Sequence, residues 1–199
     1  MAVTPVFEKG DGSGFQGNHF SVLAKWNTSG GSAAQVDDAA TKQWGICAAM
    51  TCKWIKESLA GGDLTSPSRL GSMHNIAIAH GAQRRGHLDY AADNHSEAVF
   101  VPFGLKIGTR KTGPLTSYMN LVWELMGMPG YNYLGTSKQG GHATGWKIDA
   151  RGHYFFDPNQ GLYRFDSQND LITVMSSWMK ASYFKKYLGG TWRIYNCSR

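Results

Sequence analysis

Four short apolar runs follow Pro129, and turn residues separate each run from the next. Their lengths and spacing indicate strands that form an antiparallel meander. The runs cover residues 131–135, 142–148, 152–156 and 162–165. The chain before Pro129 instead carries apolar residues three or four positions apart, which is the spacing of helices. Helices followed by a sheet predict a fold of the α+β class.

Residues that favour helix starts and helix ends predict the bounds of the helices. In the first helix an apolar face is expected, and Gly61-Gly62 ends the element. Proline after an N-cap residue, or at a helix start, marks the second and third helices. The expected helices cover 45–60, 66–83, 114–125 and 169–188; extended segments are expected at 20–26, 98–103 and 192–196.

The length of 199 residues predicts one folded domain. Residues 1–38 are rich in glycine and serine and predict a loosely structured leader, within which only 20–26 offers a strand. The folded domain is expected over residues 39–199.

Composition limits the classes of function. Three cysteines cannot build a disulfide framework, so the protein is expected to work where thiols stay reduced. The N-terminus has no apolar core of a Sec signal peptide, and no run is long enough to span a membrane. The net charge of +6 is spread over single residues and short pairs, which is typical of a solvated surface. No nucleic-acid-binding motif is present, so no nucleic-acid partner is expected.

Cys47 is a candidate nucleophile because it lies near the start of the first expected helix. A thiolate attacks carbonyl groups, and the positive end of a helix dipole favours a thiolate. Gly45 leaves room for a substrate backbone, and the N–H of Cys47 can face a developing oxyanion. A cysteine among alanines is also a common core residue, and Cys52 and Cys197 are interpreted in this way.

His142 and Asp157 are candidate partners of this cysteine. His142 begins one expected strand, and Asp157 ends the next. A turn near 149–152 would bring both side chains to the same end of the sheet. Asp157 can then accept the Nδ1 proton of His142, leaving Nε2 to face Cys47. The sequence thus predicts Cys47, His142 and Asp157 as a catalytic triad.

Three motifs that contain these residues resemble the YopT/AvrPphB group of papain-like cysteine proteases, which are bacterial effectors delivered into host cells. The resemblance covers roughly residues 40–195 in order and pattern. The motifs are Gly45-Ile46-Cys47-Ala48-Ala49-Met50, Gly141-His142-Ala143 and Phe156-Asp157-Pro158-Asn159-Gln160-Gly161.

The resemblance implies a papain-like catalytic domain over 39–199, in which a helical part carrying the nucleophile packs on an antiparallel sheet. It implies hydrolysis of a host protein through an acyl-enzyme, with no cofactor and no metal. It also implies secretion without a Sec signal and delivery into the host cytoplasm as a virulence factor. Peripheral contact with a membrane stays open.

The chain departs from the papain pattern at the oxyanion hole. Papain-like enzymes place a side-chain amide a few residues before the cysteine. Gln43 is the best candidate here, although it lies closer to Cys47 than the amide does in papain, and Asn27 is an alternative. The leader is also shorter than in such effectors, so neither self-processing nor lipid attachment is inferred.

Two other functions are left open by the sequence. Deamidases, transglutaminases and acyltransferases use the same triad and differ in what accepts the acyl group. A non-enzymatic binding module would instead use the positive charge to bind an acidic partner.

Overall fold

The computed structural model describes residues 3–8, 47–61, 99–138, 140–150, 152–158, 161–181 and 183–199. These residues form a seven-stranded sheet in which every neighbouring pair is antiparallel, with the order β1-β6-β5-β4-β3-β7-β2. The strands are β1 Val3–Glu8, β2 Lys106–Pro114, β3 Gly130–Lys138, β4 Gly140–Asp149, β5 Gly152–Asp157, β6 Gly161–Phe165 and β7 Thr191–Ser198. The helices are α3 Cys47–Leu59, α5 Tyr118–Met126 and α6 Gln168–Ala181, with short 3-10 helices η4 Val101–Phe103 and η5 Tyr183–Tyr187.

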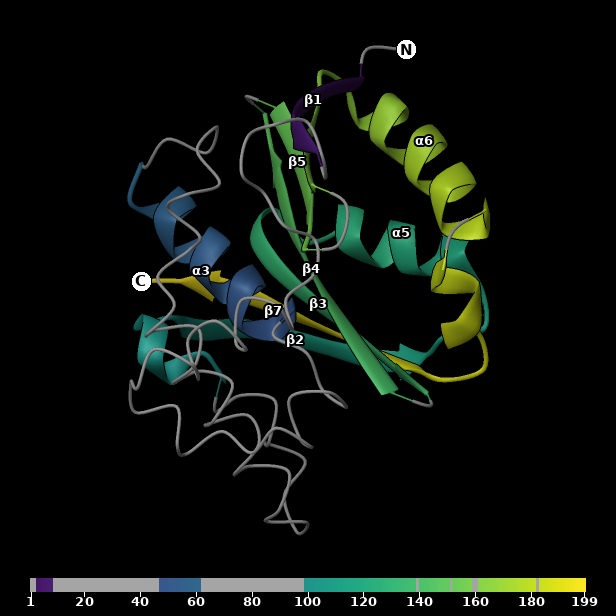
Figure 1. The fold of residues 1–199 in the computed structure, drawn as a ribbon, viewed down its shortest axis with the longest axis horizontal. Helices are drawn as coiled ribbons and strands as arrows, with labels where there is room; N and C mark the ends of the chain where they lie inside the picture. The colour runs from purple at the N-terminus through teal and green to yellow at the C-terminus, as the bar shows by residue number, and fades with distance from the viewer. Residues whose placement is uncertain are drawn as a thin grey trace, which may run out of the picture.

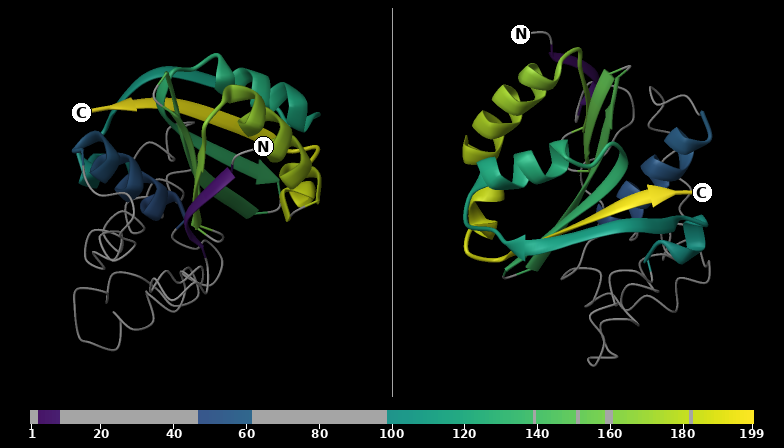
Figure 2. Two further views of the ribbon diagram at one scale, coloured as in Figure 1. Left: turned by 90° about the horizontal axis from the view of Figure 1, so that it is seen from above. Right: turned by 180° about the vertical axis from the view of Figure 1, so that it is seen from behind.

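The helices lie on both faces of the sheet (Figure 1). Helix α3 contacts β3, β4 and β5 on one face, whereas α6 contacts β6 and α5 on the other. Both views in Figure 2 show α3 on the side of the sheet away from α5 and α6. The predicted α+β class, with a helix that carries Cys47 packed on an antiparallel sheet, is confirmed.

Each face of the sheet has its own hydrophobic core. The α3 core joins the helix to residues such as Tyr133, Ala143 and Phe156. The α5/α6 core surrounds Trp146 and Phe155 of β4 and β5. Alternate residues of a strand point to opposite faces, so one sheet supplies both cores.

Helix α3 lies unusually close to β4 because residue 145 is glycine. A Cβ atom at Gly145 would lie 2.6 Å from Cζ3 of Trp54, a distance that real Cβ atoms do not adopt. The Trp54 ring is held in place because it stacks on Phe156, with the ring centroids 5.5 Å apart. All residues from Cys47 to Ile55 are buried. Gly61 follows the helix with φ of +70°, as expected for a glycine stop.

The predicted strands after Pro129 are confirmed as β3, β4, β5 and β6, and the last strand as β7. The turn expected near 149–152 is also present, since Asp149 pairs with Gly152. Gly152 has φ of +141°, a value that L-residues with side chains rarely adopt.

Two expectations around residues 98–125 are wrong. Residues 101–103 form η4 rather than an extended run, because Pro102 fits a first helical turn and Gly104 adopts φ of +65° after it. Pro114 does not open a helix but ends β2, where a residue without N–H is tolerated at the edge of the sheet. Helix α5 begins at Tyr118, after the N-cap residue Ser117.

Two further differences concern the ends of the sheet. The helix expected over 169–188 is divided into α6 and η5, and the tighter winding of η5 precedes Gly189 with φ of +80°. Residues 3–8, expected to be loosely structured, form β1 because they hydrogen-bond along the open edge of β6. The elements expected at 20–26 and 66–83 lie outside the described residues.

Candidate active site

His142 and Asp157 lie on the same face of the sheet because of the strand alternation. His142 precedes Trp146 by four residues on β4, and Asp157 follows Phe155 by two residues on β5. Trp146 and Phe155 both belong to the α5/α6 core. An even spacing keeps side chains on one face, so His142 and Asp157 also point to this side.

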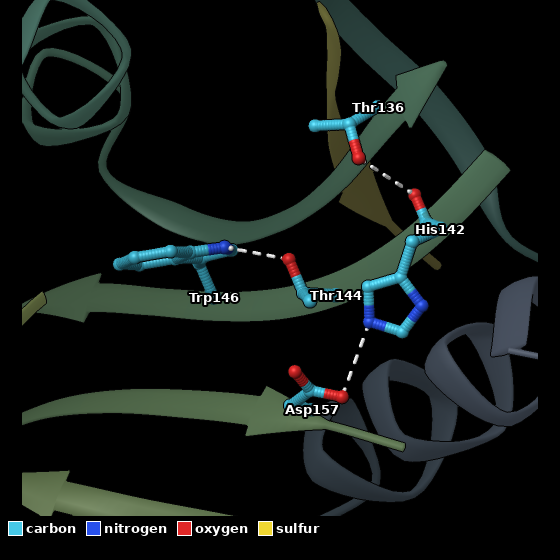
Figure 3. Close-up of polar contacts among 5 residues, drawn as sticks. All are labelled: Thr136, His142, Thr144, Trp146 and Asp157. Atoms are coloured by element: carbon cyan, nitrogen blue, oxygen red, sulfur yellow. Dashed lines mark hydrogen bonds and ion pairs between the residues drawn. The ribbon is translucent and has the colours of Figure 1, made fainter. Parts of the chain in front are cut away.

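The two side chains are in contact (Figure 3). The distance from Nε2 of His142 to Oδ1 of Asp157 is 3.1 Å. Their side chains are only 3% and 0% exposed, so water does not compete for this hydrogen bond. The hairpin of β4 and β5 thus brings the predicted base and its predicted orienting group together.

The ring nitrogen that contacts Asp157 differs from the prediction. The sequence predicted Nδ1 on the carboxylate, whereas the structure has Nε2 there. The spacing of residues determines which strands meet. It does not determine the terminal torsion of histidine, whose allowed values form a broad and nearly two-fold distribution, so the packing around the ring decides which nitrogen faces Asp157. Nδ1 points toward the side where α3 is drawn in Figure 3.

Helix α3 packs on the opposite face of the sheet, and Cys47, its first residue, approaches the pair from that side. The Cys47 side chain lies near enough to His142 to raise the pKa of the imidazole. Cys47 is 6% exposed and contributes to the α3 core together with Ala143, the neighbour of His142 in β4. All three predicted triad residues therefore meet where the start of α3 approaches the beginning of β4 and the end of β5.

The electrostatics of the site favour a charged imidazole. Burial alone lowers the pKa of His142, but the charge of Asp157 and the hydrogen bonds to Asp157 and Cys47 outweigh it. The balance raises the pKa of His142 from 6.5 to about 10. His142 is therefore an imidazolium at neutral pH, a state in which it can donate protons to both of its partners.

Tyr187 is a site neighbour that the sequence analysis missed. Its ring lies nearly parallel to that of His142, with an angle of 11° and the centroids 6.5 Å apart. Burial, followed by the charges of Cys47 and Asp157, raises the pKa of the Tyr187 phenol, so the hydroxyl stays protonated. No local motif marks this residue. The helix expected over 169–188 does not predict that its side chain reaches His142.

The other candidate residues do not join this group. Gln43 and Asn27, the two candidates for the oxyanion hole, lie outside the described residues. Burial raises the pKa of Cys52 well above its usual value and that of Cys197 to about 12. Both are neutral thiols at neutral pH, which agrees with the core role predicted for them.

Among the described residues, no group of three or more His, Cys, Asp and Glu side chains is arranged to hold a metal ion. No helix in these ranges combines the length and the apolar composition that crossing a membrane requires.

The comparisons with known proteins identify the fold. No protein-family model matches the sequence, and no curated protein does either. Among solved structures, the chain is similar to the crystal structure of the Pseudomonas avirulence protein AvrPphB, with a TM-score of 0.60 and 19% sequence identity. The match covers 77% of this chain and 92% of that chain. The resemblance read from the sequence motifs is thus confirmed at the level of the fold.

Proposed function

We propose that this chain, which has the fold of AvrPphB, is a cysteine protease with Cys47 as nucleophile, His142 as acid and base, and Asp157 as the residue that orients His142. One observation carries the proposal: a buried histidine joins a carboxylate at 3.1 Å and the cysteine at the start of a helix. This is the arrangement that activates a thiol, because a neighbouring imidazolium and a helix dipole both favour the thiolate.

Acylation follows from these positions. The Cys47 thiolate attacks a peptide carbonyl carbon and forms a C–S bond, while the carbonyl electrons move to oxygen. The backbone N–H of Cys47 stabilises this oxyanion, and Gln43 is proposed as the second donor. His142 then donates its Nδ1 proton to the leaving nitrogen, the C–N bond breaks, and a thioester remains.

Deacylation uses the same residues in reverse order. The neutral imidazole accepts a proton from a water molecule, which attacks the thioester carbonyl. The C–S bond then breaks, the carboxylic acid leaves, and Cys47 and His142 return to the thiolate–imidazolium pair. Asp157 keeps its charge throughout and holds the imidazole through Nε2.

The proposed substrate is a protein of a host cell. The support is the likeness to an avirulence protein, together with the effector group that the three motifs resemble. Delivery into the host cytoplasm also agrees with three reduced cysteines, because cytosolic thiols are kept reduced.

Thiol alkylation tests the proposed nucleophile without a known substrate. We expect iodoacetamide at pH 7 to label Cys47 at least about ten times faster than Cys52 or Cys197, since only a thiolate reacts. His142→Ala should slow the labelling of Cys47 by about 100-fold, the lower range of a general base. Peptide mapping by mass spectrometry measures each site, and the epoxide inhibitor E-64 should give the same selectivity.

Cys52 is the matched control for this experiment, because it lies on the same helix and is also buried. Its labelling should be the same in wild type and in His142→Ala. Labelling of Cys47 no faster than that of Cys52 or Cys197 would remove the basis for an activated thiol and favour the binding-module interpretation.

The pH dependence tests the role of Asp157. The carboxylate favours the imidazolium, so Asp157→Asn should lower the pKa of His142 from about 10 by about 1 to 3 units. Turnover needs the imidazolium as acid, so it is lost as pH rises through this pKa. The alkaline limb of kcat should therefore move to lower pH in the variant.

The pKa is read from the NMR titration of the His142 ring proton, assigned by comparison with His142→Gln. Asp149→Asn is the control, because Asp149 pairs with Lys147 near the opposite end of the β4–β5 hairpin. If kcat falls at the same alkaline pH in wild type and in Asp157→Asn, the role of Asp157 is contradicted.

A further inference from the structure

Tyr187 reaches the candidate site from a separate element. It is the last residue of η5, which follows α6 and contacts β3. Its side chain is 3% exposed and belongs to the α5/α6 core. The nearly parallel ring and the 6.5 Å centroid distance fit an offset stack on His142.

Groups from four different elements surround His142. Asp157 of β5 and Cys47 of α3 are the titratable groups that act on its charge. Thr136 of β3 donates a hydrogen bond to the backbone carbonyl of His142, with an Oγ1–O distance of 3.5 Å. The Tyr187 ring of η5 lies nearly parallel to the imidazole and offset from it, and its raised pKa keeps it uncharged. The exposed Lys186 of the same element has its Nζ 4.9 Å from the centroid of the Tyr187 ring.

We propose that Tyr187 is a positioning residue for His142: its ring fixes the plane of the imidazole and excludes water from the hydrogen bond between Nε2 and Asp157. The inference deepens the proposed function, because it assigns the residue that keeps the proposed base in its working orientation. An imidazole rotated about its terminal torsion would lose Asp157 or Cys47 as a partner, and a stacked ring opposes this rotation.

Exclusion of water has a direct effect on the charge of His142. Burial and the interactions with Asp157 and Cys47 act in opposite directions, and their sum raises the pKa of His142. Water would weaken both effects, so the pKa would move back toward its ordinary value of 6.5. Loss of the Tyr187 ring should therefore lower the pKa of His142, although Tyr187 carries no charge itself.

Two variants separate the ring from the hydroxyl. Tyr187→Phe keeps the stack and should leave the pKa of His142 within about 0.3 units and kcat within about threefold. Tyr187→Leu keeps an apolar side chain but removes the ring. We expect it to lower the pKa of His142 by at least about one unit and kcat by about tenfold, with KM changed less than twofold. NMR titration and steady-state kinetics give these values.

Tyr118→Leu is the control for a merely structural effect, because Tyr118 is a buried tyrosine of the same core, on α5. It should lower the melting temperature but leave the pKa of His142 unchanged. A wild-type titration of His142 in Tyr187→Leu would overturn the inference, and so would an equal shift in Tyr118→Leu. If Tyr187→Leu does not fold, Tyr187→Trp replaces it. A pKa of His142 equal to that of wild type supports the inference, because an aromatic ring is kept. A pKa lowered by about one unit or more in Tyr187→Trp contradicts it.

The test of Tyr187 can succeed or fail independently of the test of the proposed protease function. The titration of His142 needs no turnover, so a shift in Tyr187→Leu supports the positioning role even in a chain whose Cys47 is not selectively alkylated. Selective alkylation of Cys47 with no shift in Tyr187→Leu would keep the protease and remove the role of Tyr187.

Discussion

With Cys47 as the proposed nucleophile, we expect Cys47→Ala to abolish proteolysis and leave the fold intact, with a loss of turnover of about four orders of magnitude or more. The reason is that neither of the other two cysteines can replace it: Cys52 and Cys197 have raised pKa values and are buried as neutral thiols. Alanine fills most of the volume of the thiol, so helix α3 should keep its packing against β4.

Cleavage is best measured in a eukaryotic cell lysate, by mass spectrometry of new protein N-termini after incubation with the purified chain. Cys52→Ala is the control and should give the same N-termini as wild type. Full activity of Cys47→Ala would exclude Cys47 as nucleophile. A mass gain of about 1 Da in a substrate, without new N-termini, would show deamidation through the same thioester chemistry instead.

Gly145→Ala will destabilise the protein by about 3 kcal/mol, a large effect for a single methyl group. The added Cβ would meet the six-membered part of the Trp54 ring, with Cζ3 at 2.6 Å. This ring cannot move aside easily, because it stacks on Phe156 and meets Tyr131 edge-to-face at 6.2 Å. Helix α3 must shift instead, and Cys47 would move away from His142 with it.

Chemical denaturation monitored by circular dichroism measures this loss. Gly108→Ala of β2 is the control: a Cβ there has its nearest contact at 3.6 Å, so the change should stay within about 0.5 kcal/mol. Trp54→Leu in the Gly145→Ala background should recover about 1 to 2 kcal/mol relative to additivity. Additive effects of the two substitutions would show that the close approach of helix and strand is not the cause.

The sheet and the positions of the candidate triad could be predicted because they rest on local signals. Turn residues bound each strand after Pro129, and an even spacing along β4 and β5 places His142 and Asp157 on one face. The hairpin connection then determines that the two side chains meet. Cys47 could be predicted as the nucleophile from its position at a helix start alone.

The parts that could not be predicted depend on contacts between distant segments. Strand β2 is polar and lies at the edge of the sheet, so it lacks an apolar pattern and exists through its pairing with β7. The choice of Nε2 for Asp157 depends on the packing of the ring. Tyr187 reaches His142 only because α6 gives way to η5, and no residue spacing predicts that change.

The position of β7 has a consequence for how the chain is made. This strand follows all the others in sequence, yet it lies between β3 and β2 inside the sheet. During synthesis from the N-terminus, β2 must wait for a partner about 80 residues further along, and the edge of β3 waits about 60 residues for the same strand. Helix α3, made early, rests on a sheet that is completed only when residues 191–198 have left the ribosome. A nascent chain therefore carries the thiol, the imidazole and the carboxylate before it has the strand that completes the sheet beneath helix α3.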